Sequence, residues 1–342
     1  MTAAKPMSSQ PDISLDHNVA TRDDIARWSE TRWNGCWNPD QGVGLYLHAG
    51  RHPTDLAMWW VQVVVYLPNR RLTVDRRWGR STNPLGVTLE GFDLTMTPAG
   101  WTARFDSVAQ LTTIDSLALR HEGSGAPLAT VTFDVEAIGR QHEWDMYSGS
   151  DTRLDFAGEK HIQQGFTTTG TVRVGDEVYS LDGIGFKDHS AGKRDFTGWH
   201  RHHFMMLVHD DWTCHAVRML TPDGGGHTLG ALIRNGVQHK VTRFELAELA
   251  DTAGGPSTGD VLIEIDSGER LEFSSELRHA LPMLMTMDNE YVNGIDWQLA
   301  DDPIVLIEGK ARLVASDGSI VHCFHERSAR RSLVSRPITG EQ

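Results

Sequence analysis

One short stretch of the sequence concentrates side chains that can carry acid–base chemistry. Six ionisable side chains and three glycines fall between Gly183 and Asp195. A histidine beside a carboxylate works as a general acid or base near neutral pH, and an aspartic acid held against apolar walls can keep its proton. Because the glycines interrupt any strand pattern, we predict a loop here. Asp188 is its candidate acid, and His189 its candidate base.

The remaining charged residues of this stretch have two interpretations. Lys187 and Arg194 can support acid–base chemistry electrostatically. Asp188 is the direct neighbour of His189 and points to the opposite face in an extended segment. The carboxylate that orients His189 can therefore be Asp195 or Glu143. Alternatively, Arg194 and Asp195 form a structural ion-pair cluster between two domains, because a guanidinium suits a bidentate carboxylate contact. The sequence leaves both open.

A histidine cluster follows directly, at Trp199-His200-Arg201-His202-His203. On a strand, His200 and His202 share one face with Phe204. These two histidines can hold a metal if His215 supplies a third ligand, but a catalytic zinc needs three ligands with supporting contacts. We therefore predict cavity-lining roles without a resident metal, with His202 in the catalytic group.

Eleven tryptophans and several methionines suit an apolar ligand cavity. The same residues also serve as ordinary barrel core. The residues predicted to contact substrate are Trp33, Trp37, Tyr46, Trp59, Trp199, His200, Phe204, Met285 and Trp297.

Short runs rich in Val, Thr and aromatic residues, separated by Gly, Pro and Asp turns, predict an all-β chain. We expect a disordered tail over residues 1–20 and one short helix over 21–31. Two antiparallel β domains follow, over residues 21–185 and 186–335, each of which can be a sandwich or a barrel. The predicted strands cover 43–47, 57–67, 88–96, 101–106, 116–121, 128–138, 170–174, 199–209, 212–221, 227–235, 239–249, 261–266, 270–277 and 304–315. The pair His325-Glu326 ends a further strand, where we expect a surface position.

Composition excludes several classes of function. A net charge of -14 disfavours nucleic acid and anionic membrane partners. The three cysteines have no metal or disulfide spacing, and no signal peptide or membrane-spanning run is present, which favours the cytoplasm. Nucleotide-binding glycine motifs and the Gly-x-Ser-x-Gly elbow are absent from the sequence, so no cofactor is predicted.

A family resemblance becomes specific at the first motif. The run from His161 and Gln164 through Gly170 to Asp188-His189-Ser190 and Arg194-Asp195 resembles a signature of the tocopherol cyclase and carotenoid hydratase (hydroxyneurosporene synthase) group. It is more closely similar to bacterial AttH-like proteins. The resemblance implies two packed lipocalin-like barrels with an apolar cavity, and hydration, dehydration or cyclisation of isoprenoids without a redox cofactor. Ala191 stands where relatives commonly have tryptophan, so their substrates do not carry over.

We therefore predict a cofactor-independent lyase, a hydratase or dehydratase, or else an isomerase or cyclase. Its substrate would be a hydrophobic isoprenoid alcohol or alkene of terpenoid or steroid-like character. A non-catalytic lipid or terpenoid carrier using the same cavity is the main alternative, and a metal-dependent lyase or hydrolase using His200, His202 and His215 is the weaker one. A homodimer is compatible with the sequence.

Overall fold

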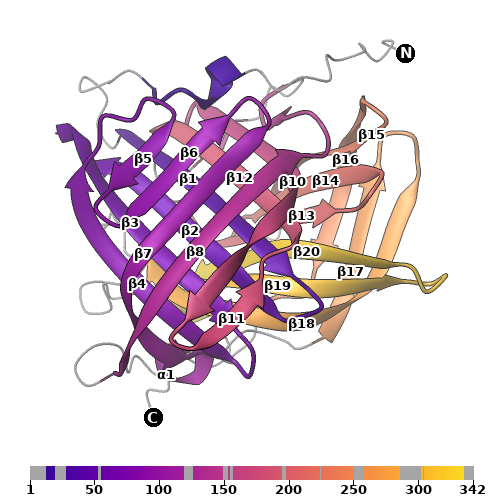
Figure 1. The fold of residues 1–342 in the computed structure, drawn as a ribbon. Coiled ribbons are helices and arrows are strands. Elements are labelled where there is room, and N and C mark those ends of the chain that lie inside the picture. The colour runs from indigo at the N-terminus through magenta and orange to yellow at the C-terminus, as the bar shows by residue number, and fades with distance from the viewer. Residues whose placement is uncertain are drawn as a thin grey trace.

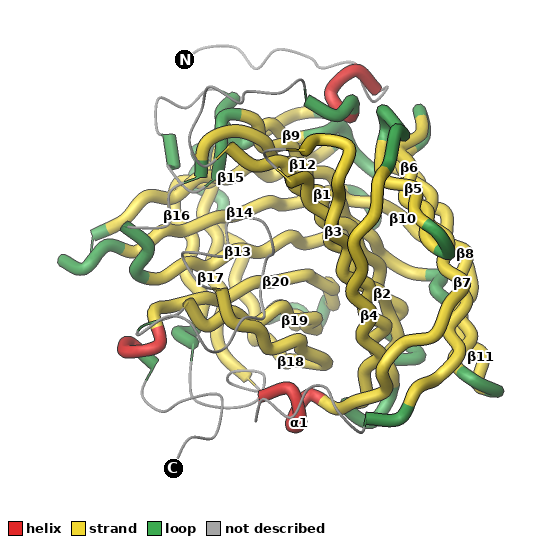
Figure 2. Tube along the Cα trace, turned by 90° about the vertical axis from the view of Figure 1, so that its left-hand side faces the viewer, coloured by secondary structure: helices red, strands yellow, loops and turns green. Residues whose placement is uncertain are grey.

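The computed structural model describes residues 13–19, 28–52, 55–118, 126–148, 153–154, 157–194, 198–223, 225–249, 258–285, 302 and 304–334. These residues form two antiparallel β-barrels side by side (Figure 1), and Figure 2 shows the same pair after a quarter turn. The predicted all-β fold with two packed barrels is confirmed. Within the described residues, no helix is long and apolar enough to cross a membrane.

Among the described residues, the first barrel is formed by a twelve-stranded sheet, and eight of its strands close the ring. The strands of the sheet are β1 (Trp28–Asn38), β2 (Val43–His52), β3 (Asp55–Leu67), β4 (Arg71–Arg80), β5 (Gly86–Leu89), β6 (Phe92–Thr97), β7 (Gly100–Thr113), β8 (Leu128–Gly139), β9 (Trp144–Asp145), β10 (Lys160–Val174), β11 (Glu177–Ser180) and β12 (Gly183–Lys193). Pairing runs from β10 through β12, β1, β2, β3, β4 and β7 to β8, which returns to β10 and closes the ring. Two short helices belong to this half, η1 (Ile13–Asp16) and α1 (Ile114–Ala118).

The second barrel closes in simple sequence order, from β13 to β20. Its strands are β13 (Arg201–Val208), β14 (Trp212–Leu220), β15 (Gly226–Arg234), β16 (Val237–Leu246), β17 (Thr258–Ile265), β18 (Arg270–Met285), β19 (Ile304–Ala315) and β20 (Ile320–Arg330), and η2 (Arg331–Leu333) follows. Last and first strands pair directly, with Phe204 of β13 opposite Glu326 of β20.

Three buried clusters account for the packing of the two barrels. One fills the first barrel around Trp59 and Trp101, and another fills the second around Phe244. The third joins Trp33 and Phe186 of the first barrel to apolar residues of the second. Strands β1 and β12 are therefore buried on both faces, one toward their own barrel interior and one toward the neighbouring barrel.

Several predicted elements need correction. The predicted loop at 183–195 is wrong for residues 183–193, which form β12 between β1 and β10. Its glycines permit close strand packing: a Cβ at Gly183 would lie 2.2 Å from the Trp37 carbonyl oxygen, and Gly192 has a φ of 132°. The predicted domain boundary at 185/186 falls inside this strand, and the chain passes to the second barrel between Lys193 and Arg201.

Other differences are local. Within the predicted helix at 21–31, residues 28–31 belong to β1, and residues 20–27 lie outside the described part of the chain. The predicted strand at 116–121 overlaps α1, and the predicted strand at 88–96 is two strands separated by a turn at Gly91. In the tail expected to be disordered, residues 13–16 form η1, where Asp16 is buried. Burial against Lys187 explains this local order, which composition alone does not reveal.

Candidate functional site

A cavity lies between the two barrels, and a transverse row of residues from each barrel lines it. In the first barrel, the register across β10, β12, β1 and β2 aligns Gln163, Asp188, Trp33 and His48. Neighbouring residues on paired strands share a face of the sheet. Strand pairing therefore presents all four side chains to the same cavity.

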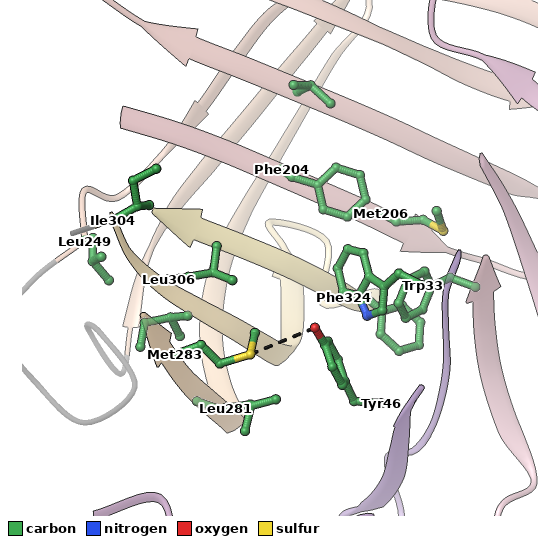
Figure 3. Close-up of a cluster of buried hydrophobic side chains, with 14 of the residues drawn as sticks. Trp33, Tyr46, Phe204, Met206, Leu249, Leu281, Met283, Ile304, Leu306 and Phe324 are labelled. Carbon is green, nitrogen blue, oxygen red and sulfur yellow. Dashed lines mark hydrogen bonds between the residues drawn. The ribbon is translucent and has the colours of Figure 1, made fainter. Parts of the chain in front are cut away.

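The facing row comes from the second barrel. Register across β19, β20, β13 and β14 aligns Glu308, Glu326, Phe204 and Val217, all of which line the cavity. Figure 3 shows the apolar part of this junction, where Met283 of the second barrel contacts Tyr46 of the first. The cavity has a volume of about 90 Å³. Sites for small molecules usually enclose about 300–1,000 Å³. The side chains lining this cavity would therefore have to move apart before it could hold a terpenoid.

Asp188 occupies the first row as a carboxylate held by two donors. One of its oxygens lies 2.5 Å from His161 Nε2, and Gln163 Nε2 donates to the same oxygen at 2.7 Å. Burial acts to raise the pKa of Asp188, but the charge of His161 and the hydrogen bonds from His161 and Gln163 bring that pKa below its usual value. The predicted role of Asp188 as a protonated acid needs the opposite shift. Its geometry suits an anion that orients His161.

Glu308 has the property expected of a proton donor. It is 3% exposed and stands opposite Glu326 in the β19–β20 pairing. Burial raises the pKa of Glu308 well above its usual range, and the nearby charges of Glu326 and Asp188 act in the same direction, against Lys310. Glu326 is half-buried and bonded at 2.8 Å to His202 Nδ1. The pair thus combines a carboxyl group that holds its proton with a second carboxyl group that has a histidine partner.

Sequence reasoning missed Glu308 and placed Glu326 on the surface with His325. In the structure His325 is buried, at 3% exposed, and Glu326 lines the cavity. The available signal was a single carboxyl in the apolar run Ile304-Val305-Leu306-Ile307-Glu308. A charged residue on such a strand is rarely buried without a reason, but its partner on β20 follows only from register.

Arg194 and a tyrosine–histidine pair complete the polar lining. Arg194 donates from Nη2 to Thr31 Oγ1 at 2.9 Å and also contacts Ser190 Oγ. Tyr46 bonds to His48 Nδ1 at 2.8 Å and contacts Met283 (Figure 3). Burial and the positive charge of Arg194 lower the pKa of His48 to about 3. His48 is therefore neutral, and it shares a hydrogen bond with the tyrosine hydroxyl.

Lys187 and His189 lie away from the cavity, on the face of β12 that is opposite to Asp188. Lys187 Nζ lies 2.6 Å from Asp16 Oδ2 and contacts Glu143. His189 Nε2 lies 2.8 Å from Glu30 Oε1.

Glu30, rather than the predicted Asp195 or Glu143, is thus the carboxylate partner of His189. Burial and the charge of Arg32 lower the pKa of His189 to about 3, which does not suit a general base at neutral pH. Ala191 does not line the cavity either. The reason is the two-residue period of a strand, which separates Asp188 from both its neighbours.

The other predicted residues divide between the cavity and its surroundings. Those lining the cavity are Trp33, Tyr46, Trp199, His202 and Phe204, in addition to Asp188 and Arg194. Trp37 packs edge-on to Tyr66 in the junction between barrels, and Trp59 lies inside the first barrel. His200 precedes β13 and does not line the cavity.

Three further predictions cannot be followed to a side chain. Met285 ends β18, but its side chain lies outside the described part of the structure, as do Asp195 and Trp297. The metal alternative finds no support where side chains are described, since no three His, Cys, Asp or Glu residues there are arranged to hold an ion. His202 instead contacts Glu326, and His215 packs on Trp144 with ring centroids 5.5 Å apart.

Comparison with known structures identifies the class of this fold. AttH from Nitrosomonas europaea is 14% identical, with a TM-score of 0.57 over 90% of this chain and 94% of that chain. Kievitone hydratase from Nectria haematococca is 11% identical, with a TM-score of 0.51 over 96% of this chain and 97% of that chain. The chain therefore has the double lipocalin-like fold of the AttH-like proteins.

The family follows from the sequence. The family described as a domain of unknown function, DUF7064, matches residues 11–301, and the chain belongs to it. This match extends from η1 across the first barrel and through β18 of the second, and it ends before β19 and β20. Among curated proteins, none matches this sequence.

Proposed function

We propose that the protein is a hydratase or dehydratase that interconverts a hydrophobic alkene of isoprenoid type and its tertiary alcohol by acid–base chemistry. One observation carries the proposal: Glu308, with a strongly raised pKa, stands opposite Glu326 in a cavity between two barrels. Two carboxyl groups in one cavity, one of which keeps its proton, are a usual means of running acid and base steps together. The reaction adds or removes only water, so the residues alone can balance it.

In the hydration direction, the Glu308 carboxyl gives its proton to one alkene carbon, and the π electron pair forms the new C–H bond. The other carbon becomes a tertiary cation, in a cavity that the aromatic residues Trp33 and Phe204 line. Water then attacks this carbon while Glu326 accepts a proton from it. Transfer of that proton from Glu326 to Glu308 restores the starting state. Dehydration follows the same steps in reverse.

The remaining polar residues have supporting roles in this proposal. Asp188 holds His161 through a 2.5 Å contact, and its negative charge favours both the cation and the protonated form of Glu308. His202 orients the Glu326 carboxylate through the 2.8 Å bond to Nδ1. One solved structure with this fold is named a hydratase. A shared fold does not assign the reaction, so the argument rests on the carboxyl pair.

The test uses oxygen exchange with labelled water. Purified protein is incubated in H₂¹⁸O with a panel of acyclic C10 and C15 isoprenoid alkenes, alcohols and unsaturated carboxylic acids, and label in the product hydroxyl group is measured by mass spectrometry. Because a general acid contributes about 10²–10⁴-fold, Glu308→Gln should reduce the rate at least a hundredfold. Glu272→Gln removes an exposed carboxyl of the same barrel and should leave the rate unchanged.

The opposite results are equally clear. Full incorporation of label by Glu308→Gln would remove the acid role assigned here. If a panel member binds tightly but neither the wild type nor the variants incorporate label into it, the result would instead favour a carrier, which releases its ligand unchanged.

A further inference from the structure

Arg194 differs from every other charged group in the cavity lining. The Asp188 carboxylate has His161 and Gln163 as donors, and the Glu326 carboxylate has His202. The guanidinium of Arg194, in contrast, bonds within the described part of the chain only to the hydroxyls of Thr31 and Ser190. Among the described residues it has no carboxylate within ion-pair distance.

The position of Arg194 makes this arrangement costly. Its Nε atom is buried without a hydrogen-bond partner in the described residues, and burial lowers the pKa of the group despite the nearby charges of Asp188 and Glu326. A buried cation whose contacts are neutral is unfavourable unless an anion completes it. Guanidinium groups fit planar oxyanions best, because two N–H groups can donate in parallel.

We propose that Arg194 binds an anionic oxygen group of the ligand, so that the substrate is an unsaturated, largely apolar acid rather than a neutral hydrocarbon or alcohol. This inference rests on the proposed function, from which it takes the reaction, and it adds the chemical class of the substrate. The carboxylate lies against Arg194, Thr31 and Ser190 on the first barrel. The apolar body extends toward Phe204 and Leu306 on the second, where Glu308 meets the alkene.

The anion also fits the electrostatics of the acid step. Burial raises the pKa of Glu308, and the negative charges of Glu326 and Asp188 act in the same direction. A ligand carboxylate in the same cavity acts in the same direction and favours the protonated acid. Binding of the charged end thus helps the carboxyl to keep its proton until the alkene is in place.

The experiment compares two dyes that differ in one charged group. 1-Anilinonaphthalene-8-sulfonate carries a sulfonate, and N-phenyl-1-naphthylamine has the same rings without it. Both are titrated by fluorescence at pH 7 and low salt into the wild type, Arg194→Met, Arg194→Lys, Glu308→Gln and Arg243→Met. Arg243 is exposed and paired with Glu245, so its variant removes one surface guanidinium as a matched control.

We expect the wild type to prefer the sulfonate. Arg194→Met should weaken sulfonate binding about ten- to a hundredfold, the loss of one hydrogen-bonded charged contact, with the neutral dye changed less than twofold. Arg194→Lys should retain part of the preference, and Arg243→Met all of it. Equal affinity for both dyes in the wild type, binding of neither, or an unchanged preference in Arg194→Met overturns the inference. An equal loss of affinity for both dyes in Arg194→Met also overturns the inference, because the guanidinium would then maintain only the shape of the cavity.

The two proposals fail in different ways. Glu308→Gln should keep the dye preference while it loses label incorporation from H₂¹⁸O. If the wild type incorporates no label into any panel member but prefers the sulfonate dye, the catalytic proposal alone is refuted.

Discussion

Replacing Lys187 with methionine tests whether this lysine is structural, as its contacts indicate, rather than catalytic. Lys187 is 1% exposed, and its ammonium contacts both Asp16 and Glu143, which are 1% and 8% exposed. Methionine fills a similar volume but leaves two buried carboxylates facing each other. Breaking a buried ion pair by removal of one partner costs about 3–5 kcal/mol, and we expect a loss of unfolding free energy in this range.

The assay is urea unfolding followed by tryptophan fluorescence, because urea does not screen charges. Arg243→Met removes an exposed cation and should not measurably change the unfolding midpoint. Adding Asp16→Asn and Glu143→Gln to Lys187→Met should restore part of the loss, since the two carboxylates no longer repel each other. Sulfonate dye binding should stay normal, because Lys187 faces away from the cavity.

A loss below about 1 kcal/mol, the range of exposed pairs, would refute the reasoning on burial. So would a loss of dye binding in a variant that remains folded.

Three further predictions concern stability. Burial lowers the pKa of His215 to about 3, so the unfolded chain binds a proton that the folded chain excludes as pH falls from about 6.5 toward this value. His215→Phe should therefore reduce the dependence of the unfolding free energy on pH by up to about 1.4 kcal/mol per pH unit. An unchanged slope between pH 6.5 and 5 would contradict it. The pKa of Glu308 is shifted in the opposite direction: it is raised, so the folded state keeps a proton that the unfolded state releases. Stability therefore falls as pH rises above the unfolded pKa of about 4.3. Glu308→Gln should be more stable than the wild type at pH 8, as measured by thermal unfolding. A Cβ at Gly309 would lie 2.3 Å from His325 Nε2, so Gly309→Ala should cost about 1–3 kcal/mol, and a variant as stable as the wild type would show that the ring moves freely.

Much of the secondary structure could be predicted from residue patterns. The alternation Phe92, Leu94, Met96 along β6 marks a strand with one face in the core, and the structure buries these three residues. Errors occurred where glycines permit close strand packing, as in β12, or where a segment is too short to show a period, as in α1. Glycine interrupts a pattern in both a loop and a tightly packed strand, so the sequence does not distinguish them.

The candidate site could be predicted only in part. Asp188, Arg194, His202 and Phe204 were named from their residue types and line the cavity. Lys187 and His189 were named because they adjoin Asp188 in sequence, whereas the strand places them on the opposite face. Glu308 was missed because the property that distinguishes it, a raised pKa, is produced by Glu326 and Asp188 and by burial between barrels.

The sequence by itself determined the all-β class, through short alternating runs and turn residues, because the strand period is a local property of the chain. It also placed acidic, basic and aromatic side chains where a cavity can use them. Only the tertiary structure decided which of them meet. Asp188 and Glu308 are brought into one cavity by strand register within each barrel and by packing of the barrels against each other. Proton affinity depends on desolvation and on charges close in space, so the assignment of acid and base had to await the fold.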